Sequence, residues 1–88
     1  MTNKSKTKIE QFVIDKVKEI RVDKGFSQEG IAEILDTTRG FIGQIESSKH
    51  PAKYNLNHLN ILATVFKCSP KDFLPERPIL ENRKRKAK

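Results

Sequence analysis

The sequence has few of the residues that support a disulfide framework, a metal site or a membrane span. Cys68 is the single cysteine among 88 residues, which excludes an intrachain disulfide and is typical of a reducing, cytoplasmic environment. Cys68, His50 and His58 do not have a zinc-ligand spacing, so we expect neither a metal ion nor a cofactor. The longest apolar runs are about three residues, too short for a membrane span or a signal-peptide core.

Residues that would support catalysis are equally scarce. His50 and His58 have no cysteine or carboxylate at the spacing of a nucleophilic site, and no glycine-rich phosphate loop occurs. A chain of 88 residues also has a small core, with little room for a buried catalytic pocket. We therefore expect a protein that is not an enzyme.

Positive charge is abundant and unevenly placed. The chain carries 18 lysines and arginines against 11 acidic residues, a net charge of +7. Residues 1–8 contribute +3, residues 75–88 contribute +4, and residues 9–74 are balanced. This distribution predicts a neutral domain over 9–74 between a flexible basic arm and a proline-containing basic tail. The excess charge indicates a polyanionic partner, nucleic acid first and an anionic membrane surface second.

The central domain has a helical pattern throughout. Apolar residues recur at three- and four-residue steps from Ile9 onward, and no strand pattern of useful length occurs. The first helix is expected to begin at Ile9 and to end at Lys24-Gly25. Four further helices are predicted from their N-cap residues, which are Ser27, Thr38, Asn55 and Ser69. We therefore expect an all-α fold of five helices, the last one short because Pro75 follows it.

Residues 27–48 predict a helix-turn-helix. Only two residues separate Leu35, near the end of the second helix, from Thr38 at the start of the third. Two helices joined so tightly must cross at a steep angle, and Ala32 supplies the small side chain that their close approach needs. In this geometry the second helix of the pair stands out far enough to enter a major groove of DNA.

From residue 17 to residue 74 the chain resembles the lambda repressor/Cro-type (Xre) helix-turn-helix family without a gap. The resemblance is carried by Arg21, Ser27-Gln28-Glu29, Ala32, Leu35, Thr37-Thr38, Ile42, Ile45-Glu46 and Ser69-Pro70-Lys71-Asp72-Phe73. It implies a compact five-helix lambda-repressor-like DNA-binding domain. Asp36 departs from the family, which often has glycine at the turn, but aspartate tolerates positive φ better than most residues.

In that family, bases are read from the first turn and from the sixth residue of the third helix. The resemblance therefore implies base contacts by Thr38, Arg39, Gly40, Phe41 and Gln44. Arginine is the commonest bidentate reader of guanine, glutamine pairs with adenine, and an apolar ring can contact a thymine methyl. Gly40 lacks the side chain that the family usually has there. The alternative is an ordinary solvated helix face with Phe41 in the core, or contact with another helix, although each glycine in this helix costs about 1 kcal/mol of helix stability.

The resemblance also implies a phosphate-binding layer and a structural ion pair. Family members bind the DNA backbone with the glutamine that opens the second helix and with the loop before the fourth. The matching and neighbouring residues here are Gln28, Ser47, Lys49, His50, Lys53 and Asn55. Arg21 and Glu46 match a buried family pair that ties the first helix to the third. Two surface charges worth under ~1 kcal/mol are the alternative for this pair.

Three functions are compatible with the sequence. The first is a sequence-specific transcriptional regulator, a repressor, that binds a near-palindromic operator in double-stranded DNA as a homodimer. Its dimer surface would be the fifth helix with Ile79-Leu80. The second is an antitoxin that binds a partner toxin and represses its own operon, which an apolar patch outside the fifth-helix surface would favour. The third and weakest is a basic peripheral membrane protein.

Overall fold

Polar side chains at five positions decide where the helices begin. In the computed structural model, which describes residues 6–81, each N-cap side chain accepts a hydrogen bond from a backbone N–H of the first helical turn. The caps are Thr7, Ser27, Thr38, Asn55 and Ser69. The four predicted caps are confirmed. Thr7 forms a capping box with Glu10, so the first helix begins at Lys8, one residue before the expected Ile9.

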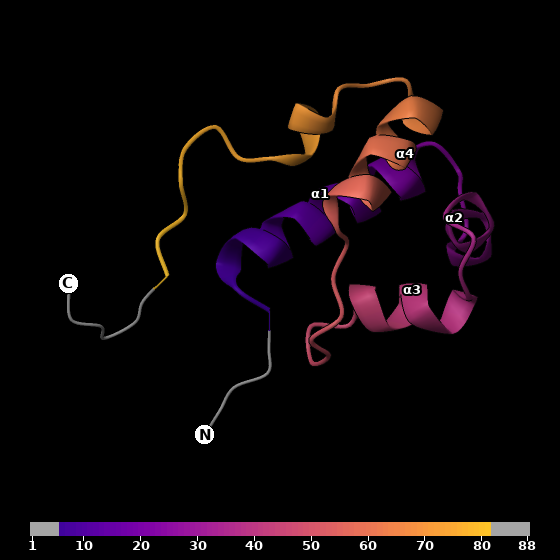
Figure 1. The fold of residues 1–88 in the computed structure, drawn as a ribbon, viewed down its shortest axis with the longest axis horizontal. Coiled ribbons are helices and arrows are strands. Elements are labelled where there is room, and N and C mark those ends of the chain that lie inside the picture. The colour runs from indigo at the N-terminus through magenta and orange to yellow at the C-terminus, as the bar shows by residue number, and fades with distance from the viewer. Residues whose placement is uncertain (1–5, 82–88) are drawn as a thin grey trace.

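Four α-helices and one 3-10 helix follow from these caps. They are α1 (Lys8–Asp23), α2 (Gln28–Ile34), α3 (Arg39–Glu46), α4 (Leu56–Phe66) and η1 (Pro70–Phe73). Helix α2 packs against α3, α3 also contacts α1, and η1 packs against both α4 and α1. Figure 1 shows α3 at one edge of the molecule and η1, between α4 and the C-terminal segment, at the opposite edge. Among the described residues there is no strand, and no helix is long and apolar enough to cross a membrane.

One hydrophobic core joins all five elements. Phe66 of α4 contacts two other aromatic rings, Phe26 at a centroid distance of 5.6 Å and Phe73 at 6.2 Å. Each α-helix contributes apolar residues at the three- and four-residue steps that the sequence predicts. The buried residues are Val13, Ile14, Val17, Ile31, Ala32, Leu35, Ile42, Ile45, Tyr54, Leu59, Leu62, Ala63, Phe66 and Phe73.

The prediction of five α-helices is wrong for the last element. Residues Pro70–Phe73 form a single 3-10 turn, started by a capping box between Ser69 and Asp72. Leu74 already has an extended backbone, with φ −105° and ψ 152°, because the residue before a proline is driven out of the helical region by Pro75. Too few residues remain between the cap and the proline for an α-helix. Phe73 is nevertheless fully buried, so the turn is anchored in the core.

The segment after η1 is irregular and returns to the start of α1. At its end the carboxylate of Glu81 accepts a hydrogen bond of 3.0 Å from the backbone N–H of Lys8. A carboxylate at this place is favourable because the first N–H groups of a helix carry partial positive charge. The basic residues of the predicted arm before residue 6, and those of the predicted tail after residue 81, lie outside the described residues.

Candidate nucleic-acid interface

The turn between α2 and α3 is as tight as the sequence predicts. Asp36 adopts the left-handed conformation, with φ 57°, and the Thr37 N–H donates to the carbonyl of Ala32 at 2.8 Å. Ala32 is only 2% exposed, so this small side chain of α2 is buried in the core. The pair α2–α3 therefore has the arrangement of a helix-turn-helix, with an aspartate in the backbone conformation that glycine adopts most easily.

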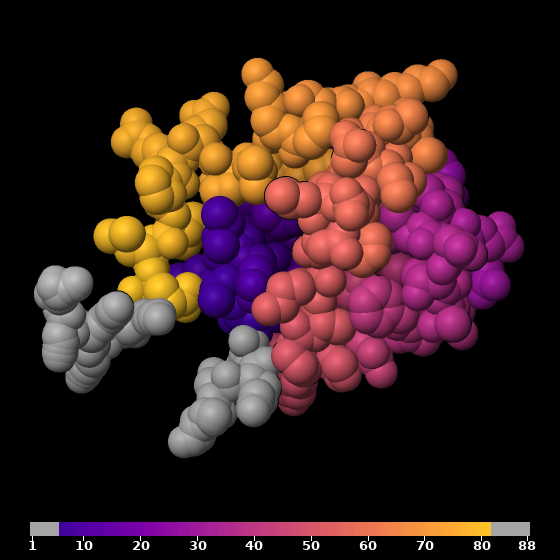
Figure 2. All heavy atoms as spheres, in the orientation of Figure 1, coloured from indigo at the N-terminus to yellow at the C-terminus, as the bar shows by residue number. Residues whose placement is uncertain are grey.

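Helix α3 has one buried and one exposed face. Ile42 and Ile45 are fully buried in the core, whereas Arg39, Gly40 and Gln44 are exposed. Ile42 and Ile45, three positions apart, share one face of the helix, and Gly40 and Gln44, four positions apart, share the opposite face. Arg39 is exposed at the first position of the helix. Figure 2 shows α3, in magenta, at the surface along the lower right of the molecule. The structure thus brings the predicted readers Arg39, Gly40 and Gln44 together on one accessible surface.

Thr38 and Phe41, the other two predicted base contacts, also make contacts within the protein. Thr38 is exposed, and its hydroxyl oxygen accepts a hydrogen bond of 3.1 Å from the Phe41 N–H, so it is used as the helix cap. Phe41 is partly buried against the core, and its ring stands edge-on to His58 at a centroid distance of 6.3 Å. Part of the Phe41 ring is therefore occupied by packing within the protein.

The two glycines of α3 are not required by the packing of the protein. A Cβ atom at Gly40 would come no closer than 3.9 Å to Thr38 Oγ1, and one at Gly43 no closer than 3.9 Å to Gln28 Oε1. Both distances are ordinary van der Waals separations, so alanine would fit at either position. Since each glycine costs about 1 kcal/mol relative to alanine inside a helix, the fold alone does not explain them.

A buried ion pair ties α3 to α1. Arg21 donates from Nε to Glu46 Oε2 at 2.9 Å and from Nη2 to Glu46 Oε1 at 3.1 Å. The two side chains are 11% and 5% exposed. Arg21 Nη1 also donates to the Phe26 carbonyl at 2.8 Å, and Gln28 Nε2 donates to Glu46 Oε1 at 2.9 Å. One carboxylate therefore links the end of α3 to α1 and to the first residue of α2.

Tyr54 lies close to this network. Its hydroxyl oxygen is buried and is without a hydrogen-bond partner among the described residues. Burial raises the pKa of the Tyr54 phenol above its usual value, and the charge of Glu46 adds to this effect. The phenol is therefore neutral, and it belongs to the wall of the core next to the ion pair.

Five of the six predicted phosphate contacts lie in the segment between α3 and α4, and the sixth, Gln28, is the first residue of α2. Ser47, Lys49 and Lys53 are exposed, and so is Asn55, which also caps α4. Lys53 is paired with Glu10, Nζ to Oε2, at 3.0 Å. The remaining two are engaged inside the protein: Gln28 with Glu46, as above, and His50 through Nδ1, which accepts from the Ala52 N–H at 3.1 Å.

Lys6 also belongs to this loop, although the sequence places it in the basic arm. Its ammonium group donates to the backbone carbonyls of Ser47 and His50, directly after the C-terminus of α3, where a cation is favoured. Burial lowers the pKa of Lys6, against the opposing effect of the Glu10 carboxylate. The contact spans 41 residues, so no local sequence signal could have predicted it.

The helix-turn-helix itself is not basic. Residues 27–48 contain four acidic residues and one basic residue, a net charge of −3. Glu46 is neutralised by Arg21, and the positive charge next to α3 comes from Lys49, Lys53 and Lys6. Any attraction of this surface to a polyanion therefore depends on the loop and on the two ends of the chain more than on α2 and α3.

Comparison with known proteins shows that the fold of this chain is similar to that of a solved structure. No protein-family model matches the chain, and no curated protein matches it either. Among solved structures, the chain is similar to a hypothetical transcription factor, NHTF, from Neisseria, with a TM-score of 0.64 and 19% sequence identity. The match covers 76% of this chain and 75% of the Neisseria chain. The all-helical fold of this protein is thus shared with a protein described as a transcription factor.

Proposed function

We propose that this protein is a sequence-specific DNA-binding transcriptional regulator of the lambda repressor/Cro type. The observation that carries the proposal is the exposure of Arg39 and Gln44 on a helix whose opposite face, Ile42 and Ile45, is fully buried. A short helix held in this way behind a tight turn can enter a major groove. The transcription-factor description of the Neisseria structure supports the same class of function.

In this proposal α3 reads bases and the loop after it binds the backbone. Arg39 would make a bidentate contact with guanine, and Gln44 would contact adenine. Lys49 and the exposed Ser47 would contact phosphates, which position the helix without reading sequence. The Arg21–Glu46 pair is assigned a positioning role, because it fixes the end of α3 against α1.

We assign the regulator as a repressor that acts as a homodimer. One helix of eight residues reads too few bases to select a single site in a genome. Two copies related by a two-fold axis double the readout, and their half-sites lie about 10 base pairs, one helical turn, apart. The operator would therefore be near-palindromic, and occupying it would block transcription.

The test is a binding selection from random duplexes with the full chain. We expect one near-palindromic motif to be enriched, and a footprint over that motif on a longer duplex. Recovery of unrelated sequences, with equal affinity for all of them, would contradict the proposal and would favour binding by charge alone.

An antitoxin role is a second candidate because apolar surface is exposed outside η1. Leu56 of α4 is 81% exposed, and Ile61 is 41% exposed. A partner toxin could cover this surface while α3 binds the operator of the same genes. Expression of the chain with its neighbouring genes, followed by purification, would give a stable complex of two different chains. A chain that purifies alone from such a strain would count against this role.

A further inference from the structure

His58 of α4 is not among the base or phosphate contacts that the sequence predicts, yet it touches one of them. It occupies the third position of the helix and forms a capping box with Asn55. Its backbone N–H donates to Asn55 Oδ1 at 2.8 Å, and its Nδ1 accepts from the Asn55 N–H at 3.0 Å. An imidazole thus stands where a capping box usually has glutamate or glutamine, and it places an aromatic ring at the start of α4.

Two contacts fix the orientation of this imidazole ring. The hydrogen bond to Nδ1 ties the ring to the backbone of Asn55. The Tyr54 ring stands edge-on to it, at a centroid distance of 5.9 Å and an angle of 82°, and Tyr54 is itself only 8% exposed. Burial lowers the pKa of His58, which favours the neutral ring that an accepting Nδ1 requires. The imidazole is therefore anchored both to the start of α4 and to the core.

The anchored imidazole meets Phe41 of α3. The two ring centroids are 6.3 Å apart and the rings stand at 63°, within the range in which aromatic rings attract each other. Phe41 is half-buried against the core and belongs to the helix that exposes Arg39 and Gln44. A phenyl ring has no hydrogen-bonding atom to orient it, so its position depends on the surfaces that pack against it. His58 is such a surface, and it comes from a different helix.

We propose that His58 is a positioning residue for base recognition, which holds the Phe41 ring where its accessible part contacts a thymine methyl group. The inference rests on the proposed function, in which Phe41 is a base contact, and it adds a residue of α4 to that site. A methyl contact depends on where the apolar ring lies. Without the imidazole, the Phe41 side chain could turn into the space left behind, and the contact would be lost.

Two substitutions separate this role from capping alone. His58→Gln removes the ring but keeps an acceptor at a position where glutamine completes a capping box. His58→Phe keeps a ring but removes the acceptor. If His58 positions Phe41, base recognition fails in His58→Gln and survives in His58→Phe. If His58 only caps α4, His58→Gln recognises DNA like the wild-type chain.

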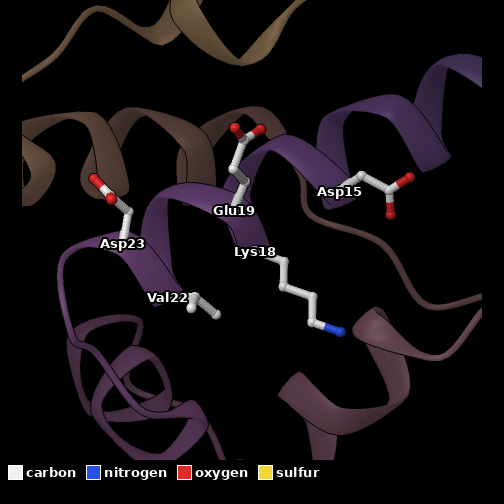
Figure 3. Close-up of a pocket in the computed structure, with 5 residues that line it drawn as sticks. All are labelled: Asp15, Lys18, Glu19, Val22 and Asp23. Atoms are coloured by element: carbon white, nitrogen blue, oxygen red, sulfur yellow. The ribbon is translucent and has the colours of Figure 1, made fainter.

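The control lies on a face that is unsuited to DNA. The exposed face of α1 carries Asp15, Lys18, Glu19, Val22 and Asp23. Figure 3 shows the three carboxylates on successive turns of that helix, where they would repel a phosphate backbone. Val22 is 60% exposed among them, so Val22→Gln should change neither the affinity for DNA nor the position of Phe41.

The DNA experiment replaces each thymine of the selected duplex in turn by uracil, which lacks the methyl group. For the full wild-type chain we expect one replacement to weaken binding about fourfold, the effect of losing one buried methyl group. Phe41→Ala and His58→Gln should abolish this difference, whereas His58→Phe and Val22→Gln should retain it. The inference is overturned if no replacement matters, or if Phe41→Ala or His58→Gln keeps the preference for thymine.

A measurement without DNA tests the positioning by itself. Three-bond NMR couplings report the χ1 rotamer of Phe41 in the full chain. We expect one rotamer in the wild-type chain and in His58→Phe, and an average over several in His58→Gln. A single unchanged rotamer in His58→Gln would overturn the inference. Failure to enrich any duplex would overturn the proposed function instead, and these couplings would still decide whether His58 holds Phe41 in place.

Discussion

Arg39 is exposed to a ligand because the buried residues of α3 fix how the helix is turned against the core. The burial of Ile42 and Ile45 fixes the rotation of the helix and leaves Arg39 exposed at its first turn. We predict that Arg39→Ala weakens binding to the selected duplex by about 1–3 kcal/mol and relaxes the preference at one base pair. Titration against single-base variants of the site measures both effects. Arg77→Ala, at another exposed arginine, should leave the base preferences unchanged. Equal weakening on specific and random DNA would make Arg39 a phosphate contact.

Gly43 gives a case in which stability and binding are predicted to change in opposite directions. We expect Gly43→Ala to raise the free energy of unfolding by about 1 kcal/mol, because alanine favours the helix and a Cβ fits. Affinity for the selected duplex should fall several-fold, since the added methyl group occupies the surface that approaches DNA. The matched control is Gly30→Ala in α2, where a Cβ also fits. Unchanged affinity in Gly43→Ala would show that no ligand needs the bare backbone there.

The Arg21–Glu46 pair is buried, so breaking it should be costly. Arg21→Met would leave the carboxylate of Glu46 with Gln28 as its one remaining side-chain donor within residues 6–81. We predict a loss of about 3 kcal/mol in the free energy of unfolding, measured by urea denaturation. Lys16→Met on the same helix removes an exposed ion pair with Glu19 and should cost less than about 0.5 kcal/mol. Equal losses in the two variants would mean that the Arg21–Glu46 pair contributes no more than a surface pair.

The turn between α2 and α3 is one of two places among the described residues where a residue other than glycine has a positive φ, the other being Lys67 at the end of α4. Asp36 has φ 57°, a conformation that glycine adopts without a Cβ clash. We predict that Asp36→Gly raises the free energy of unfolding by up to about 1 kcal/mol and keeps DNA binding. Gly25→Ala should have the opposite sign, because Gly25 has φ 81° with no atom near its Cβ position. Thermal melts of both variants would measure the two changes in stability. A lower melting temperature for Asp36→Gly than for the wild-type chain would show that the positive φ of Asp36 costs no stability.

Local signals predicted the starts of the helices and missed what depends on distant contacts. Ser27, Thr38, Asn55 and Ser69 cap helices because a polar side chain reaches its own backbone three residues on, or two for Ser69, which needs no tertiary structure. The Thr7 capping box has an equally local signature and could have been found. The cap at Ser69 can begin either kind of helix, and the signal that favours a 3-10 turn is the short distance from that cap to Pro75, which the sequence also contains.

In the candidate site, too, local sequence signals predict some residues, and the positions of others depend on distant contacts. The exposed face of α3 follows from the helical period, so Arg39 and Gln44 could be placed from the sequence. The partners Arg21 and Glu46 came from a family resemblance, since no period relates residues 25 positions apart. The inward hydrogen bond of Gln28 and the contact of Lys6 with the loop after α3 depend on how the helices pack, so neither has a local sequence signature.

At the scale of the whole molecule, the excess positive charge and the helix-turn-helix lie in different parts of the chain. The helix-turn-helix is net negative, and the excess positive charge lies toward the two ends of the chain. We predict that exchanging Arg83, Lys84, Arg85, Lys86 and Lys88 for glutamine weakens binding to all duplexes without changing the preferred sequence. The slope of log affinity against log salt should become shallower by about 0.9 for each phosphate that the tail no longer neutralises. Titrations at three salt concentrations measure this slope, and identical slopes for both proteins would leave the tail without a role in binding.

We propose that the folded chain reads DNA sequence through α3. The ratio of its affinities for the selected near-palindromic duplex and for a random duplex of equal length, at one physiological salt concentration, tests this proposal. We predict a ratio of about 10³ or more, in the range of specific DNA-binding proteins, and a fall in that ratio for Arg39→Ala. A ratio near one for the wild-type chain would mean that the chain binds DNA through its charge alone and that α3 does not read sequence.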